Sequence, residues 1–148
     1  MLYQSLSSGA ELWRRYASSS ASIRYKLPAN VAINGMSALL ETKNGFVDAN
    51  PYAHEAARML VEEAIVAANV CGCTLEHDAE PAHAFEVARM TDETISSMVQ
   101  DVTHHKETEI RIITGAVCRP GRAHHVPTPC NDLLLQLVLA KQSIYLGR

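Results

Sequence analysis

The sequence lacks the features that mark a membrane-spanning or a nucleic-acid-binding protein. No run of apolar residues approaches the ~20 that a membrane-spanning helix needs, although just under half of the 148 residues are apolar. Basic residues gather in no stripe, and the formal net charge is −3 at pH 7, which argues against a nucleic-acid surface. We therefore expect neither a membrane nor a nucleic acid as a partner.

A secretory signal is also missing. The first residues, MLYQSLSSGAELWRR, have no cationic start followed by an apolar core. In a chain without such a signal, the four cysteines are expected to be reduced thiols rather than a disulfide framework. We expect a cytoplasmic protein.

The cysteines and histidines also lack the spacing of common zinc sites. The CGC at 71–73 lacks the two-residue spacer of common zinc knuckles, and the histidine pairs at 104–105 and 124–125 are not matched by a second ligand pair at zinc-site spacing. We expect no metal site, with a metalloprotein built on these histidines and cysteines as a minor alternative.

Glycine is not arranged to bind a nucleotide. The seven glycines never form G-x-G-x-x-G, and no strand, glycine turn and helix follow one another. The chain on its own is therefore predicted to lack a nucleotide-binding device.

What the sequence does contain is helical periodicity with clear start and stop signals. Apolar residues recur at helical spacing over 27–41, with Pro28 near the start, where a proline is tolerated. Asn50 and Thr128, each followed by proline, are typical N-caps. Further helices are expected over 51–70, 79–90, 92–106, 108–121 and 129–146. The prediction is an all-α bundle of five or six helices over 23–148, preceded by a polar, serine-rich connector over 1–22.

Three polar stretches stand out on these helices. Lys26, Asn30 and Asn34 are four residues apart, so on a helix they share one face. The second stretch is SSMVQD at 96–101, and the third is the Thr-Glu pair at 108–109. Taken singly, each has a more ordinary interpretation: a surface charge, a helix N-terminal turn and a solvated ion pair.

Their order is more specific than any one of them. The succession K-x3-N-x3-N, N-G, S-S-M-x-Q-D, T-E-I and P-x-N resembles the C-terminal helical domain of ketopantoate reductase (2-dehydropantoate 2-reductase), over roughly residues 20 to 142. The resemblance implies the bundle fold of the C-terminal domains of 6-phosphogluconate-dehydrogenase-like reductases. It also implies NADPH-dependent reduction of a 2-oxo acid, ketopantoate to pantoate, in pantothenate biosynthesis.

The family's cofactor lies on an N-terminal Rossmann domain that is absent from this sequence. We therefore expect a Rossmann domain as partner, in cis or in trans, and no turnover by this chain alone. The helical domain over 23–148 is expected to bind the substrate and to mediate dimerisation.

The resemblance also implies roles for residues of the first polar stretch. Lys26 matches the catalytic lysine that protonates the carbonyl oxygen, a task suited to a preorganised positive charge. Asn30, Asn34 and Asn44 match substrate-binding asparagines, whose neutral amides hold oxygen atoms without adding a competing charge. Pro28, between the lysine and the first asparagine, departs from the regular helical pattern.

Further roles follow for the other two stretches. Ser97 matches the hydroxyl that binds the substrate carboxylate, and Met98, Val99 and Gln100 belong to the same substrate-binding region. Glu109 matches an acidic residue near the cofactor and the lysine. The residue two positions on is an arginine where the family commonly has an acid.

An alternative from a different class is a non-catalytic helical module. Such a module would bind a small carboxylate or form a homodimer through the apolar segment LLLQLVLA, residues 133–140.

Overall fold

The structure is a computed structural model that describes residues 9–17 and 26–148. Within these ranges every regular element is an α-helix, so the predicted all-α class is confirmed. The helices, in chain order, are α1 (Gly9–Ala17), α3 (Lys26–Leu40), α4 (Gly45–Ala49), α5 (Pro51–Val70), α6 (Ala79–Met90), α7 (Ser97–Thr103), α8 (Ile110–Ile113), α9 (Gly115–Ala123) and α10 (Pro129–Leu146). In the described ranges, no helix has the length and apolar character needed to cross a membrane.

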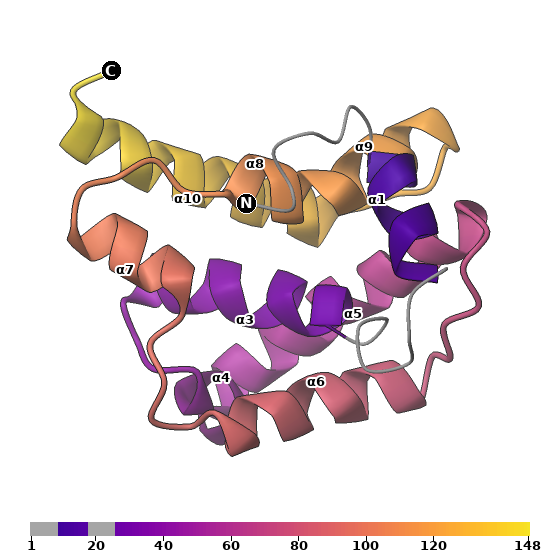
Figure 1. The fold of residues 1–148 in the computed structure, drawn as a ribbon, viewed down its shortest axis with the longest axis horizontal. Coiled ribbons are helices and arrows are strands. Elements are labelled where there is room, and N and C mark those ends of the chain that lie inside the picture. The colour runs from indigo at the N-terminus through magenta and orange to yellow at the C-terminus, as the bar shows by residue number, and fades with distance from the viewer. Residues whose placement is uncertain (1–8, 18–25) are drawn as a thin grey trace.

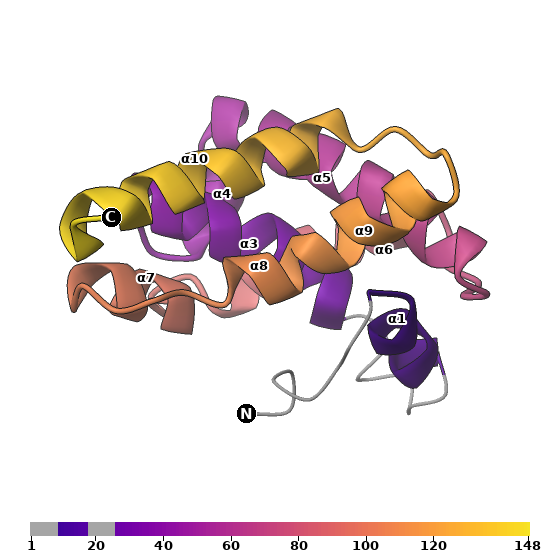
Figure 2. The same cartoon turned by 90° about the horizontal axis from the view of Figure 1, so that it is seen from above.

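Helix α3 runs through the middle of the bundle (Figure 1). The long helices α5, α6 and α10 pack against it, as do the short helices α4, α7 and α8. A view turned by 90° places α10 on one side of the molecule and α1 on the other (Figure 2). Between residues 27 and 38, only Asn30 and Asn34 escape full burial.

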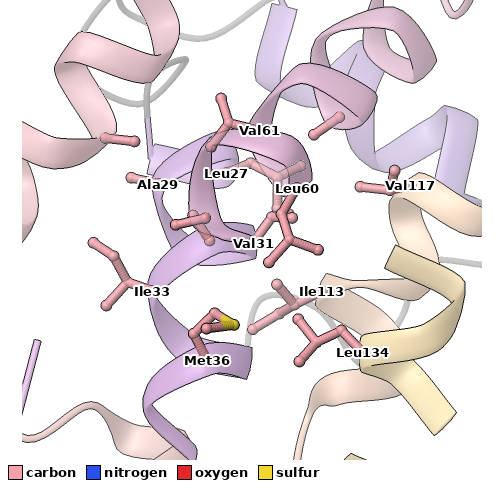
Figure 3. Packing of buried hydrophobic residues seen from close by; sticks show 14 of the residues in the cluster. Leu27, Ala29, Val31, Ile33, Met36, Leu60, Val61, Ile113, Val117 and Leu134 are labelled. Carbon is pink, nitrogen blue, oxygen red and sulfur yellow. The ribbon is translucent and has the colours of Figure 1, made fainter. Parts of the chain in front are cut away.

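The core forms where α3 meets α5 and the C-terminal helices. Figure 3 shows branched aliphatic side chains converging there, each at most 4 % exposed: Leu27, Val31, Leu60, Val61, Ile113, Val117 and Leu134. Full burial of one such side chain stabilises the fold by about 1.5–3 kcal/mol. Gly35 permits the close approach of α10, because a Cβ at this position would lie 2.6 Å from Leu134 Cδ2.

The prediction of a polar connector over 1–22 differs from the structure at residues 9–17, which form α1. This helix packs on α9 and buries Leu12 and Trp13. The indole N–H of Trp13 donates a hydrogen bond to the carbonyl oxygen of Ala116 at 2.8 Å. The segment is short and amphipathic, and the serine-rich sequence that flanks it favours a connector. Its apolar face is buried against a distant helix. The rest of the predicted connector lies outside the described residues.

Several predicted helix starts agree with the structure to within one residue. Helix α5 begins after Asn50, whose Oδ1 accepts hydrogen bonds from the N–H groups of Tyr52 and Ala53 at 3.0 and 3.1 Å. Helix α3 begins at Lys26, one residue before the predicted start. Pro28 is therefore in the first turn, where its missing N–H leaves no carbonyl unpaired.

Two predicted helices were wrong in extent. The helix predicted over 92–106 begins only at 97, because Thr91 ends α6 and Ser96 provides the N-cap of α7. The helix predicted over 108–121 is divided at Thr114 into α8 and α9. These divisions and the short helices α1 and α4 bring the helices of the described ranges above the predicted five or six.

Helix α10 begins at its predicted residue, but its cap comes from another helix. The Thr128 side chain makes no capping hydrogen bond. The carboxylate of Glu63 in α5 accepts instead from the backbone N–H groups of Cys130 and Asn131, both at 2.9 Å. The buried Asn131 adds its Nδ2 to Glu63 at 2.8 Å. A carboxylate here satisfies helix N–H groups that have no partner within the helix and complements the helix dipole.

This cap can be tested against the neighbouring acid. We expect Glu63→Ala to lower the free energy of unfolding by about 1–2 kcal/mol in urea titrations, the cost of losing an N-cap. Glu62→Ala is the control, because Glu62 pairs with Arg58 on the surface, and it should cost less than about 0.5 kcal/mol. Equal losses in the two variants would contradict the role of Glu63.

Candidate functional site

The polar stripe of α3, defined as Lys26, Asn30 and Asn34, is the uncovered line of an otherwise buried helix. Lys26 is exposed and the two asparagines are half-buried. Each four-residue step advances about 6 Å along the same face. Because the helix begins at Lys26, the spacing holds despite Pro28. The stripe therefore offers an ammonium and two amides in a row.

The N-terminal end of α7 is attached to α3 close to this stripe. Ser96 caps α7 by accepting the Val99 N–H at 3.2 Å. The same Oγ lies 3.0 Å from Oγ of Ser37, in a buried hydrogen bond. Ser37 lies one turn beyond Asn34, so this contact brings the first turn of α7 to the end of the stripe. Ser97, the first residue of α7, is exposed there.

Helix α8 begins beside the same part of α3. The backbone N–H and the hydroxyl of Thr108 both donate to Oε1 of the buried Gln142, each at 2.8 Å. The buried Ile110 lies against α3, since its Cδ1 would be 3.4 Å from a Cβ at Gly35. The half-buried Glu109 lies between these two fixed residues.

The segments 96–98 and 108–110 therefore have the same structural pattern. In each, a buried hydroxyl residue is hydrogen-bonded to another helix, the next residue reaches solvent, and the third packs in the core. The two triplets are Ser96, Ser97 and Met98, and Thr108, Glu109 and Ile110. The middle residue is the one that each motif leaves available for a ligand.

The other residues predicted around Ser97 have their own contacts. The side chains of Met98 and Val99 are 1 % and 3 % exposed and belong to the core. Gln100 is exposed, and its Nε2 donates to the carbonyl oxygen of Ile95 at 3.3 Å. A ligand would reach Met98 and Val99 only through their backbone.

Asn44 joins the turn after α3 to the loop between α6 and α7. Its backbone N–H donates to the carbonyl oxygen of Thr94 and its Nδ2 donates to Oγ1 of Thr91, both at 3.0 Å. The side chain is buried, and its Oδ1 has no hydrogen-bond partner among the described residues. Asn44 thus supports the loop that leads to Ser97, and its side-chain oxygen remains able to accept a hydrogen bond.

Glu109, the acid of this site, has no ion-pair partner among the residues that the structure describes. Glu109 occupies the N-cap position of α8 without a side-chain capping bond. Within the described ranges, no ion pair joins Glu109 to Lys26 or to Arg111, the arginine that departs from the family pattern.

The histidine pairs have structural positions. His104 and His124 are the C-caps of α7 and α9, and His105 and His125 follow with φ of 55° and 56°, a left-handed conformation that histidine tolerates better than most residues. In the part of the chain that the structure describes, no group of three or more His, Cys, Asp or Glu side chains could hold a metal ion.

The cysteines are held as thiols. Cys73 donates its S–H to the carbonyl oxygen of Trp13 at 3.4 Å. Burial raises the pKa of Cys73 to about 11 and, together with the nearby Asp132, raises the pKa of Cys118 to about 12. Both groups stay protonated at neutral pH, which makes them poor nucleophiles.

A family model and the curated relatives both match this chain to ketopantoate reductases. The family model described as "Ketopantoate reductase PanE/ApbA C terminal" matches residues 20–142. The 2-dehydropantoate 2-reductase of Pyrobaculum aerophilum is 35 % identical over 119 residues, which cover 80 % of this chain and 42 % of that protein. The chain spans about two fifths of the length of the curated relatives it matches.

Solved structures show the same fold. A ternary complex of D-mandelate dehydrogenase with NADH and anilino(oxo)acetate superposes with a TM-score of 0.78 at 30 % identity, covering 84 % of this chain and 69 % of that one. A dimeric ketopantoate reductase from Staphylococcus aureus gives a TM-score of 0.74 at 26 % identity, covering 84 % and 43 %.

The turn that supports Ser97 can be tested at Gly45. Its N–H donates to the Asp92 carbonyl oxygen at 3.2 Å, and a Cβ would overlap the Asp92 carboxylate and lie 2.9 Å from Asp92 Cα. We expect Gly45→Ala to lower the free energy of unfolding by about 1–3 kcal/mol and to shift the amide NMR signals of Ser96 and Ser97. Adding Asp92→Gly should recover part of the loss. Unchanged stability and unchanged signals in Gly45→Ala would refute this account of the turn.

Proposed function

This chain belongs to the family of ketopantoate reductase C-terminal domains, and we propose that it is the substrate-binding and catalytic helical half of an NADPH-dependent 2-oxo acid reductase. The observation that carries this proposal is the polar stripe of α3. Lys26, Asn30 and Asn34 form the open line of a helix whose other residues are buried from 27 to 38. An ammonium and two amides in a row can bind the oxygen atoms of a small polar ligand.

The described residues do not provide a cradle for the cofactor. They contain no strand, and so no strand, glycine turn and helix that would hold a pyrophosphate. We place NADPH on a Rossmann domain, in cis or in trans, where it would supply a hydride to the carbonyl carbon of the substrate. Glu109 is the residue of this chain that we propose to lie near that cofactor.

Lys26 is the proposed proton donor. Negative charge develops on the carbonyl oxygen as the carbon is reduced, and an adjacent ammonium stabilises this charge and then protonates the oxygen to give the hydroxyl group. In the free chain Lys26 is exposed, so water would weaken this interaction. A covering domain would exclude the water and strengthen it.

The remaining polar groups are proposed to hold the substrate. Asn30 and Asn34 can donate hydrogen bonds to its oxygen atoms or accept them from its hydroxyl groups, and Ser97 can donate a hydrogen bond to its carboxylate. The buried Oδ1 of Asn44 can accept a hydrogen bond from a hydroxyl group. Ketopantoate is the substrate that the family name suggests. The structural likeness to D-mandelate dehydrogenase supports a site that accepts other bulky 2-oxo acids as well.

The proposal is tested by NADPH oxidation with ketopantoate as substrate. We expect no turnover by the chain alone, and turnover when it is mixed with the Rossmann domain of the Pyrobaculum aerophilum relative. Lys26→Ala should reduce this rate by about 100-fold or more. Lys43→Ala is the matched control, because Lys43 pairs with Glu93 at the surface, and its rate should be unchanged. The proposal would be overturned if the mixture of two folded partners oxidised no NADPH. It would also be overturned if Lys26→Ala kept full activity.

An apolar groove favours self-association as a second role. The groove lies between α3, α5 and α10 and has a volume of about 280 Å³. Its lining residues are Met36, Leu39, Ala56, Met59, Leu60, Cys130, Leu133, Leu134 and Leu137. Three of them are more than 40 % exposed: Leu133 at 61 %, Leu137 at 43 % and Met59 at 41 %. Exposed side chains of this kind on one face are typical of an interface.

We propose a second copy of this chain as the occupant of the groove. Helix α1, the described element nearest to any preceding domain in sequence, lies on the opposite side of the molecule from α10 (Figure 2). The groove is therefore turned away from that end of the chain. The dimeric relative from Staphylococcus aureus supports the choice of a homodimer.

The dimer is tested by size-exclusion chromatography with light scattering. We expect the unaltered chain to be dimeric at tens of micromolar, an ordinary affinity for a weak interface. Leu137→Glu should make it monomeric, because a carboxylate would be buried without a partner. Ile144→Glu is the control, because Ile144 is on the same helix but outside the groove lining. A monomeric unaltered chain, or equal effects of the two variants, would contradict this interface.

A further inference from the structure

The loop between α7 and α8 is held by the C-terminal end of α10. Oε1 of Gln142 accepts two hydrogen bonds from Thr108, one from its backbone N–H and one from its hydroxyl, both at 2.8 Å. The hydroxyl of Tyr145 donates to the carbonyl oxygen of Lys106 at 2.8 Å. The loop residues from 103 to 107 are exposed. Thr108 is thus the point where an exposed loop becomes fixed in the interior.

We propose that Gln142 is a positioning residue for Glu109, and this inference rests on the function proposed above. Thr108 immediately precedes Glu109, so fixing both the backbone and the side chain of Thr108 fixes the direction in which α8 starts. Glu109 makes no capping bond of its own to hold it in place. The backbone from which its carboxylate projects is therefore placed by the residues on either side of it, and Gln142 holds one of them.

The location of Gln142 supports this role. It lies on the buried face of α10, in line with the buried Leu135 and Val138, and is 6 % exposed. An apolar side chain would pack at such a position without the cost of burying an amide. An apolar residue would also leave the N–H and the hydroxyl of Thr108 without an acceptor. The glutamine is explained by what it does for Thr108 rather than by the packing of α10.

The test uses turnover by the chain in complex with a Rossmann domain. Gln142→Leu removes the hydrogen-bond acceptor but keeps a side chain of similar volume. We expect turnover to fall about tenfold to a hundredfold, because a displacement of Glu109 by about 1 Å has a cost of this size. Gln142→Glu keeps an acceptor oxygen and should restore most of the rate. Gln136→Leu is the control, because it makes the same chemical change at an exposed position of α10.

A double-mutant cycle with Glu109→Ala separates positioning from general stability. If Gln142 acts through Glu109, Gln142→Leu has little further effect on turnover once Glu109 is removed. An equal loss with and without Glu109 would overturn the inference. If Gln142→Leu fails to fold, Thr108→Val replaces it in the cycle, because it removes only the hydroxyl donor.

A second measurement does not depend on turnover. Amide hydrogen exchange at Thr108, followed by NMR in the chain alone, should be faster in Gln142→Leu and close to normal in Gln142→Glu. Unchanged exchange in Gln142→Leu would refute the inference even if the proposed function holds. If the complex of the unaltered chain has no activity, the proposed function is refuted. The role of Gln142 in turnover is then refuted as well.

Discussion

Helix α3 has packed neighbours along most of its surface, and the arrangement of the other helices follows from that requirement. Its buried residues contact α5, α6 and α10 as well as three short helices, while its polar stripe, Lys26, Asn30 and Asn34, stays in contact with solvent. Because the core is close-packed, the helix cannot rotate or slide without opening cavities. The packing therefore fixes the backbone positions from which Asn30 and Asn34 project, and a fixed backbone is one requirement of a binding site.

The two short motifs extend this rigidity to residues outside α3. Ser96 is hydrogen-bonded to Ser37, and Thr108 to Gln142, and each is followed after one residue by a buried side chain. The residue in between has little freedom, although its side chain is accessible. Much of what makes these motifs recognisable in the sequence is thus the requirement to attach a loop to the bundle, and only the middle residue of each is left for a ligand.

The parts of the fold that could be predicted are those that depend on neighbours in sequence. Asn50 capping its own helix and the four-residue spacing of the stripe are local patterns. The parts that could not be predicted depend on distant partners. The burial of Trp13 requires α9, and the cap of α10 is Glu63, 67 residues before Cys130. The site follows the same division: its presented residues were predicted from the motifs, but the residues that hold them, such as Gln142, were not.

The exposure of Lys26 has a consequence for how such a chain would act. Opposite charges 4 Å apart attract by about 1 kcal/mol in bulk water and several times more where water is excluded. An ammonium that stays in solvent therefore gives little stabilisation to a developing alkoxide, so the proposed chemistry needs a second domain over the polar stripe. The apolar groove is formed on the α10 side of the bundle, opposite α1 (Figure 2). None of the residues that line the groove belongs to the polar stripe, so a dimer at the groove and a second domain over the stripe would contact different residues.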